Sequence, residues 1–78
     1  MNIDLVLAEV KREFYRASSM FPRFHSAHEG LAVIWEEFEE LKIEVFKNEK
    51  EKNLEKIMVE AYQVAAMAIR FIVDCDKK

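Results

Sequence analysis

Glutamate residues recur at short spacing in one part of this chain. Glu37 and Glu40 are three residues apart and Glu44 follows four residues later, so on a helix the three would share one side. Glu60 and Gln63 repeat the three-residue spacing further along. Carboxylate and amide oxygens are the ligands that hard divalent cations such as Mg²⁺ prefer. A cation site is therefore conceivable, provided that the two segments lie against each other.

A helical projection sorts the glutamates of the first segment into two groups. With Leu31 placed at zero and 100° added per residue, Glu37 falls at about 240°, Glu40 at about 180° and Glu44 at about 220°. The apolar stripe centres near ~320°, so these three flank the side that faces the core. Glu36 and Glu39 point further toward solvent.

The elements that must position these side chains are helices. The chain holds one Gly and one Pro, which leaves little material for the turns of a β fold. Apolar residues recur at helical spacing in three segments. We therefore expect an all-α domain over residues 1–78, with helices at about 3–18, 27–48 and 53–76.

Capping residues support these boundaries. Asn2, Ser26 and Asn53 are candidate N-caps, and Ser26 with Glu29 fits a capping box, in which each side chain bonds the other's backbone N–H. The connection at 18–25 contains three large apolar side chains, so we expect it to pack against the core.

The second and third helices form a long antiparallel hairpin in this interpretation. With the turn near residue 50, Glu40 and Glu60 are equally distant from it, and so are Glu37 and Gln63. Equal distances from an antiparallel turn place residues at the same height. The hairpin therefore predicts that these four side chains converge between the helices.

Three carboxylates in one place repel each other, and partial burial adds a desolvation cost. A bound Mg²⁺ relieves both, and it usually completes its shell with waters and substrate phosphates. Such a site suits hydrolysis of a phosphoanhydride, because a carboxylate can orient the attacking water. The alternative is a solvated face with ordinary ion pairs such as Glu40–Lys47.

At this point the residues resemble a known family. Segment 36–40 has the pattern EExxE, and segment 60–63 stands where the MazG-like, all-α nucleoside triphosphate pyrophosphohydrolases have ExxD. The flanking segments 28–34 and 64–70 look like that group too, and the likeness covers Ser26 to Asp74.

The resemblance implies a helical bundle that completes its core as a homodimer or a dimer of dimers. It implies Mg²⁺-dependent cleavage of a nucleoside triphosphate to the monophosphate and pyrophosphate. Glu37, Glu40 and Glu60 would be metal ligands, with Glu36 beside them in the motif and Glu37 and Glu40 serving catalysis.

The chain departs from the family pattern at Gln63, where the motif has aspartate. A glutamine oxygen can ligate a metal but brings no charge, so we expect a weakened site. Glu44, one turn from Glu40, could compensate.

Apolar side chains cover nearly the whole circumference of the third helix from Ala61 to Val73. Such a helix must be buried on more than one side. Two partner helices within 78 residues cannot enclose it, so we predict that a second subunit covers it. The second helix has one expected core stripe: Leu31, Ile34, Trp35, Phe38, Leu41 and Val45.

Trp35 and Arg70 are candidate substrate-binding residues. Trp35 is an expected core residue that could instead stack on a base. Arg70 could reach a phosphate or pair with Asp74 at i, i+4. His25 and His28 are expected at the surface or near the helix cap, because no third ligand accompanies them.

Composition excludes several function classes. The net charge is −3 without a basic patch, which argues against a nucleic-acid polymer as partner. No apolar run is long enough for a membrane span, and the first residues lack the pattern of a signal peptide. The lone Cys75 fits a reducing compartment, so we expect a cytoplasmic protein.

Two functions remain in view. The first is a MazG-like, Mg²⁺-dependent nucleoside triphosphate pyrophosphohydrolase, weakened by Gln63. The second is a non-catalytic helical dimer that serves as a protein-interaction or regulatory module.

Overall fold

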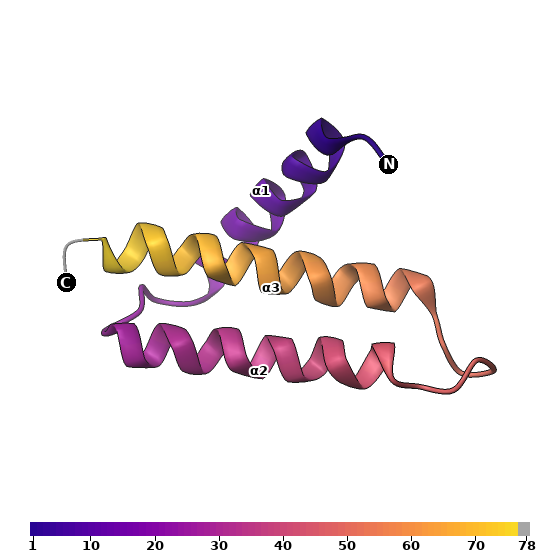
Figure 1. The fold of residues 1–78 in the computed structure, drawn as a ribbon. Helices are drawn as coiled ribbons and strands as arrows, with labels where there is room; N and C mark the ends of the chain where they lie inside the picture. Colours follow the sequence, from indigo (N-terminus) through magenta and orange to yellow (C-terminus); the bar gives the residue numbers. More distant parts are fainter. Residues whose placement is uncertain (77–78) are drawn as a thin grey trace.

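Three α-helices make up the fold, in a computed structural model that describes residues 1–76 (Figure 1). They are α1 (Ile3–Met20), α2 (Ala27–Val45) and α3 (Leu54–Cys75), and residues 1–76 contain no strand. The expected all-α chain of three helices is confirmed over that range. α1 continues to Met20 instead of ending at residue 18, and α2 ends at Val45 instead of residue 48. Residues 77–78 of the expected domain lie outside the described residues.

Each helix begins at a side chain that caps it. The Oδ1 of Asn2 accepts from Asp4 N (2.7 Å), and Asn53 Oδ1 accepts from Lys56 N (3.2 Å). Ser26 Oγ accepts from Glu29 N (3.1 Å). The expected capping box is only half formed. The Glu29 carboxylate accepts instead from the backbone N–H of His25 at 3.0 Å, one residue earlier than a capping box requires.

α3 is the central helix of the arrangement. α2 lies beside it in the antiparallel direction, and α1 crosses it obliquely (Figure 1). α1 and α2 each pack on α3 but not on each other. A space therefore remains between α1 and α2, and α3 forms one side of it. None of the helices within residues 1–76 is both long enough and apolar enough to cross a bilayer.

A small core forms where α1, α3 and the first connection meet. Its buried members are Val10, Ala17, Phe24, Ala66 and Met67. Gly30 lets α2 approach α3 closely here, because a Cβ at Gly30 would lie 2.6 Å from Cδ2 of Phe71.

The connection between α1 and α2 is fastened to α3, as expected from its apolar residues. Phe24 is buried, and its backbone N–H donates to Asp74 Oδ2 at 3.1 Å. Arg70 donates from Nη2 to the carbonyl of Pro22 at 2.9 Å and stacks its guanidinium 4.5 Å from the centre of the Phe24 ring. The connection is thereby held over the end of the hairpin, while Phe21 stays exposed.

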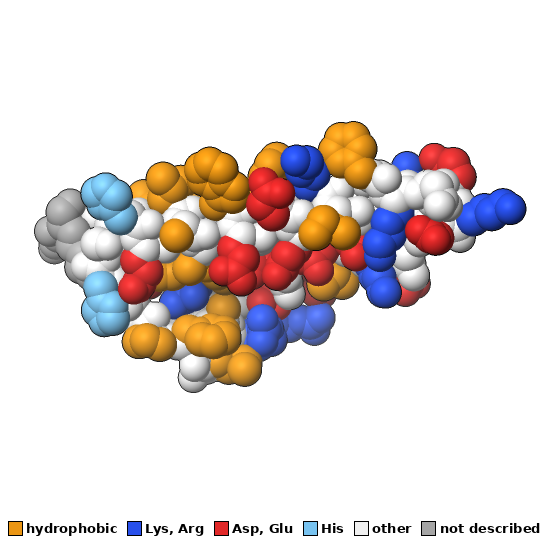
Figure 2. All heavy atoms as spheres, turned by 90° about the horizontal axis from the view of Figure 1, so that it is seen from below, with side chains coloured by type: hydrophobic (Ala, Val, Ile, Leu, Met, Phe, Trp, Pro, Cys, Tyr) orange, Lys and Arg blue, Asp and Glu red, His pale blue; other side chains and the backbone are white. Residues whose placement is uncertain are grey.

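The expected core stripe of α2 is mostly on the surface, which corrects the sequence-based interpretation. Leu31, Trp35 and Phe38 are each more than half exposed, and the one buried residue of α2 is Gly30. The reason is that α2 has a single partner helix, which covers one side of it. Figure 2 views the molecule from the α2 side. It shows acidic side chains along the middle of the view, with hydrophobic side chains on both sides of them.

Candidate metal centre

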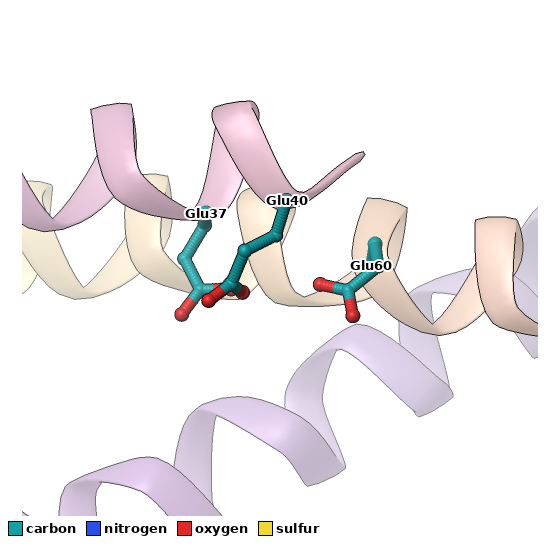
Figure 3. A group of neighbouring side chains, drawn as sticks. All are labelled: Glu37, Glu40 and Glu60. Carbon is teal, nitrogen blue, oxygen red and sulfur yellow. The ribbon is translucent and has the colours of Figure 1, made fainter. Parts of the chain in front are cut away.

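Three carboxylates from two helices meet in the space beside α1. Glu37 and Glu40 come from α2 and Glu60 from α3, and each offers an oxygen within 4.8 Å of the others (Figure 3). All three side chains point to the same side of the hairpin, toward α1 (Figure 3). Among residues 1–76, this is the one group of three or more His, Cys, Asp or Glu side chains that could hold a metal ion together.

The local sequence explains why these side chains meet. Glu37 and Glu40 are three apart on α2, which places them one above the other on one face. The antiparallel α3 brings Glu60 and Gln63 to the same height. The structure thus assembles the four residues that the hairpin spacing predicted, although α2 is shorter than expected.

Gln63 joins the group through its amide. With the amide nitrogen turned toward the carboxylates, it donates to Glu37 Oε2 at 3.0 Å and to Glu60 Oε2 at 3.1 Å. The sequence-based interpretation gave Gln63 an acceptor role, in which its oxygen ligates a metal. In this orientation, which satisfies both carboxylates, it is a hydrogen-bond donor that links a carboxylate of α2 to one of α3.

Electrostatic repulsion and burial both act on the cluster. Burial, followed by the charges of Glu40 and Glu60, raises the pKa of Glu37 to about 7. Burial and the neighbouring Glu40 also raise the pKa of Glu60. The cluster therefore takes up positive charge readily, as a proton or as a cation.

The other glutamates of the segment have separate partners or positions. Glu44 is paired with Lys47 at 3.0 Å, so its carboxylate is engaged by a lysine one turn away. Lys47 thus pairs with Glu44 and not with Glu40. Glu39 accepts from Trp35 Nε1 at 3.2 Å, and Glu36 is exposed.

A hollow of about 420 Å³ adjoins the cluster between α1 and α2. Apolar side chains from all three helices line one part of it: Ala17, Val33 and Met67, together with Phe24 of the connection. Charged side chains line another part, among them Arg16 of α1 and Glu37 of the cluster. The hollow thus combines apolar walls with direct access to a candidate metal ligand.

Sequence reasoning missed the contribution of α1 to this site. Glu13 and Arg16 line the hollow, yet their i, i+3 spacing resembles that of any surface ion pair. The one available signal was their position near the core residue Ala17, with Glu13 one turn before it and Arg16 directly before it. How α1 crosses α3 cannot be obtained from that position.

Trp35 does not lie in a core as expected, whereas Arg70 forms the expected i, i+4 pair with Asp74. Trp35 is 61% exposed and is not among the residues that line the hollow. It is not a core residue of this chain. Arg70 lines the hollow but is 3% exposed, with Asp74 at 3.8 Å. Its Nη2 donates to the carbonyl of Pro22 in the connection and its Nη1 to the sulfur of Met67, which favours a structural role over substrate binding.

The histidines and the cysteine lie apart from the cluster. His25 is exposed, with its Nδ1 3.2 Å from Glu29, and His28 is exposed at the start of α2. Cys75 is a free thiol whose Sγ lies 3.8 Å from the carbonyl of Ser26.

The chain matches no family model, no curated protein and no solved structure. The function is therefore argued from the geometry of the cluster and the hollow.

Proposed function

We propose that this chain is a Mg²⁺-dependent nucleoside triphosphate pyrophosphohydrolase. One observation carries the proposal: carboxylates of Glu37, Glu40 and Glu60 converge within 4.8 Å beside a hollow that is open to a ligand. Three oxygen donors at this separation suit a hard divalent cation that keeps open positions for water and phosphates. The resemblance of segments 36–40 and 60–63 to the MazG-like pattern supports the same activity.

The reaction splits the bond between the α-phosphorus and the oxygen that bridges it to the β-phosphate. Water attacks the α-phosphorus, the pair of electrons of the broken bond stays on pyrophosphate, and a proton of the water must be removed. When bound, Mg²⁺ neutralises phosphate charge and favours the in-line displacement. A carboxylate oxygen of Glu37 or Glu40 that faces the water orients it and accepts its proton.

The hollow supplies room for the nucleoside. Its volume of about 420 Å³ is within the range of small-molecule pockets, roughly 300–1,000 Å³. A flat base fits between apolar walls such as Val33 and Met67, while Glu37 stands at the boundary with the metal cluster. A nucleotide bound in this way would place its phosphates beside the carboxylates.

Gln63 weakens this site without removing it. The cluster holds three carboxylates, and the fourth position holds an amide that donates to two of them. Ligating a metal through its oxygen requires Gln63 to turn its amide and give up both hydrogen bonds. We therefore expect slow turnover and a need for millimolar Mg²⁺.

A second copy of this chain completes the fold in our proposal, as a homodimer or a dimer of dimers. The exposed apolar side chains occur on both helices of the hairpin, such as Trp35 and Phe38 on α2 and Ile72 and Val73 on α3. A domain of this size buries only about 60–65% of its unfolded surface and is marginal alone. A cytoplasmic location would keep Cys75 reduced and supply the nucleotides.

The same exposed apolar surface favours the second candidate, a non-catalytic helical dimer that binds or regulates a protein partner. The amide at position 63, in place of a carboxylate, is compatible with such a role. The two candidates differ in whether the chain binds Mg²⁺ and releases pyrophosphate.

The deciding experiment incubates the pure protein with Mg²⁺ and a panel of canonical and modified ribo- and deoxynucleoside triphosphates, and measures pyrophosphate. We expect release from at least one nucleotide, and Glu40→Gln should abolish it without lowering helix content. Glu39→Gln is the matched control. Glu39 is next to Glu40 in the sequence, but its carboxylate accepts a hydrogen bond from Trp35 and is not part of the cluster. Absence of both pyrophosphate release and Mg²⁺ binding in calorimetry would reject the enzyme and favour the second candidate.

A further inference from the structure

Arg16 is the accessible cation of the hollow. The residues that line the hollow include two cations, Arg16 and Arg70. Arg70 is 3% exposed and its Nη2 is committed to the carbonyl of Pro22. The Arg16 side chain is 50% exposed, so a ligand in the hollow can reach its guanidinium.

Glu13 holds Arg16 in a fixed orientation. Its carboxylate accepts from Arg16 Nε at 2.9 and 3.0 Å and from Nη2 at 2.5 Å. The Glu13 side chain is only 17% exposed, so the anchor itself is well packed. Nη1 of Arg16 meets the sulfur of Met20 at 3.1 Å, which is a weak acceptor that an anion would readily replace.

Arg16 and one member of the carboxylate cluster face the same hollow. Both Arg16 and Glu37 line the hollow, although they come from helices that do not pack on each other. The hydrogen bonds and charge of Glu13 raise the pKa of Arg16, and the charge of Glu37 adds to this effect across the gap. An anion placed between the two would meet a guanidinium on one side and the carboxylate of Glu37, one of the three candidate metal ligands, on the other.

We propose that Arg16 binds phosphate oxygens of a polyphosphate chain whose other oxygens bind the Mg²⁺ held by Glu37, Glu40 and Glu60. This rests on the proposed function, which it deepens by assigning the phosphate-binding cation to α1. A planar guanidinium suits phosphate, because its parallel N–H groups match two oxygens at once. Glu13 is then a positioning residue. It keeps the guanidinium from pairing with Glu37 and closing the site.

Arg12 offers a matched control for Arg16. It lies one turn earlier on α1 and pairs with Glu9 at 2.9 Å in the same i, i+3 geometry, but it does not line the hollow. Replacing either arginine by glutamine removes one exposed positive charge and one surface ion pair. Only the Arg16 change removes a cation beside the carboxylate cluster.

The test measures binding of inorganic tripolyphosphate by calorimetry in excess Mg²⁺, with Mg²⁺ alone titrated separately. We expect Arg16→Gln to raise the tripolyphosphate Kd about tenfold or more, as the loss of charged hydrogen bonds implies. The tripolyphosphate Kd of Arg16→Lys should lie between those of the unchanged protein and Arg16→Gln. The Kd of Arg12→Gln should stay within about twofold of that of the unchanged protein. Thermal melts monitored by circular dichroism check that each variant folds.

The outcomes separate this inference from the proposed function. Equal tripolyphosphate affinity in the Arg16→Gln and Arg12→Gln proteins overturns the role of Arg16, while Mg²⁺ binding and pyrophosphate release still support the enzyme. An unchanged protein that binds Mg²⁺ but not tripolyphosphate also overturns it. An unchanged protein that binds no Mg²⁺ rejects the proposed function and this inference together.

Discussion

Gln63 donates its amide N–H to Glu37 Oε2 at 3.0 Å, from α3 to α2, at the centre of the carboxylate cluster. The same amide also reaches Glu60 at 3.1 Å. A neutral donor therefore links the two helices at a height where three carboxylates repel one another. This relationship makes Gln63 a stabilising element of the hairpin and, under the proposed function, the residue expected to limit metal affinity.

Gln63→Glu is expected to lower the stability of the fold and to raise the affinity for Mg²⁺. Glutamate has the same shape, but it replaces a hydrogen-bond donor by a fourth negative charge. Without divalent cations at pH 8, the variant should melt at a lower temperature because repulsion between the helices grows. Its Mg²⁺ affinity should rise on the order of tenfold, since ligand charge tunes such sites. Calorimetry and thermal melts measure the two effects.

Gln63→Met is the control for that change, because it keeps a similar shape and supplies neither a donor nor a charge. It should lower the melting temperature slightly and leave Mg²⁺ affinity nearly unchanged. A Gln63→Glu protein that binds Mg²⁺ no more tightly than Gln63→Met would show that the cation does not sit at this cluster.

The pKa of Glu37 predicts a pH dependence of stability. The pKa is raised from 4.5 to about 7 on folding, so between these values the folded chain holds more protons than the unfolded chain. The free energy of unfolding must therefore fall as pH rises through this window. The stability associated with protonated Glu37 is complete below pH 4.5 and lost above about 7.

Glu37→Gln should remove the part of this dependence that comes from Glu37, and the raised pKa of Glu60 should leave a smaller dependence of the same sign. The variant should gain melting temperature relative to the unchanged protein at pH 8 and gain little at pH 5, in buffers with a chelator. Glu39 directly precedes Glu40 in the sequence but is not part of the cluster, so Glu39→Gln should show no such difference. Under the proposed function Mg²⁺ would compete with the proton at Glu37, so the Mg²⁺ affinity of the unchanged protein should weaken as pH falls below about 7.

Local patterns were sufficient to predict the cluster. The positions of Glu37, Glu40, Glu60 and Gln63 depend on helical periodicity and on distance from one turn, and both can be counted along the sequence. The helix ends were less certain: α2 stops at Val45, which did not disturb residues one or more turns earlier. Periodicity therefore predicted the part of the site that lies on the hairpin.

The rest of the site depends on how the helices cross. Arg16 is an ordinary surface arginine until α1 lies across α3 and faces Glu37 over the hollow. Trp35 was expected in a core because it belongs to an apolar stripe, but α3 covers only part of that stripe, such as Ile34, and leaves Trp35 exposed. The spacing of residues along the sequence predicts neither the angle at which α1 crosses α3 nor which surface covers α2.

Gly30→Ala is expected to destabilise the chain, although alanine favours helices. The new Cβ would lie 2.6 Å from Cδ2 of Phe71 and 3.1 Å from Cδ2 of Phe24, so α2 and α3 must move apart or the rings must shift. Overpacking costs about 1–3 kcal/mol, and the gain in helix propensity returns about 1 kcal/mol. A net loss of about 1 kcal/mol lowers the melting temperature by roughly 4–8 °C.

A double-mutant cycle identifies the cause of that loss. In a Phe71→Leu background the smaller side chain leaves room for the Cβ, so Gly30→Ala should cost less than it does alone. If both backgrounds lose the same melting temperature, contact with Phe71 is not the reason for glycine at this position.

Trp35 is the position at which the proposed second subunit is tested most directly. Its indole is 61% exposed in the single chain, beside Leu31 and Phe38 at helical spacing on α2. If a second copy covers this stripe, light scattering at micromolar concentration gives at least a dimer, and Trp35→Lys shifts it toward monomer because a lysine charge resists burial. Lys56→Glu changes charge at the start of α3, away from this stripe, and should leave the assembly intact. A monomer for the unchanged protein contradicts the dimer. An assembly that survives Trp35→Lys at full strength shows that the Trp35 stripe of α2 is not the surface that holds the subunits together.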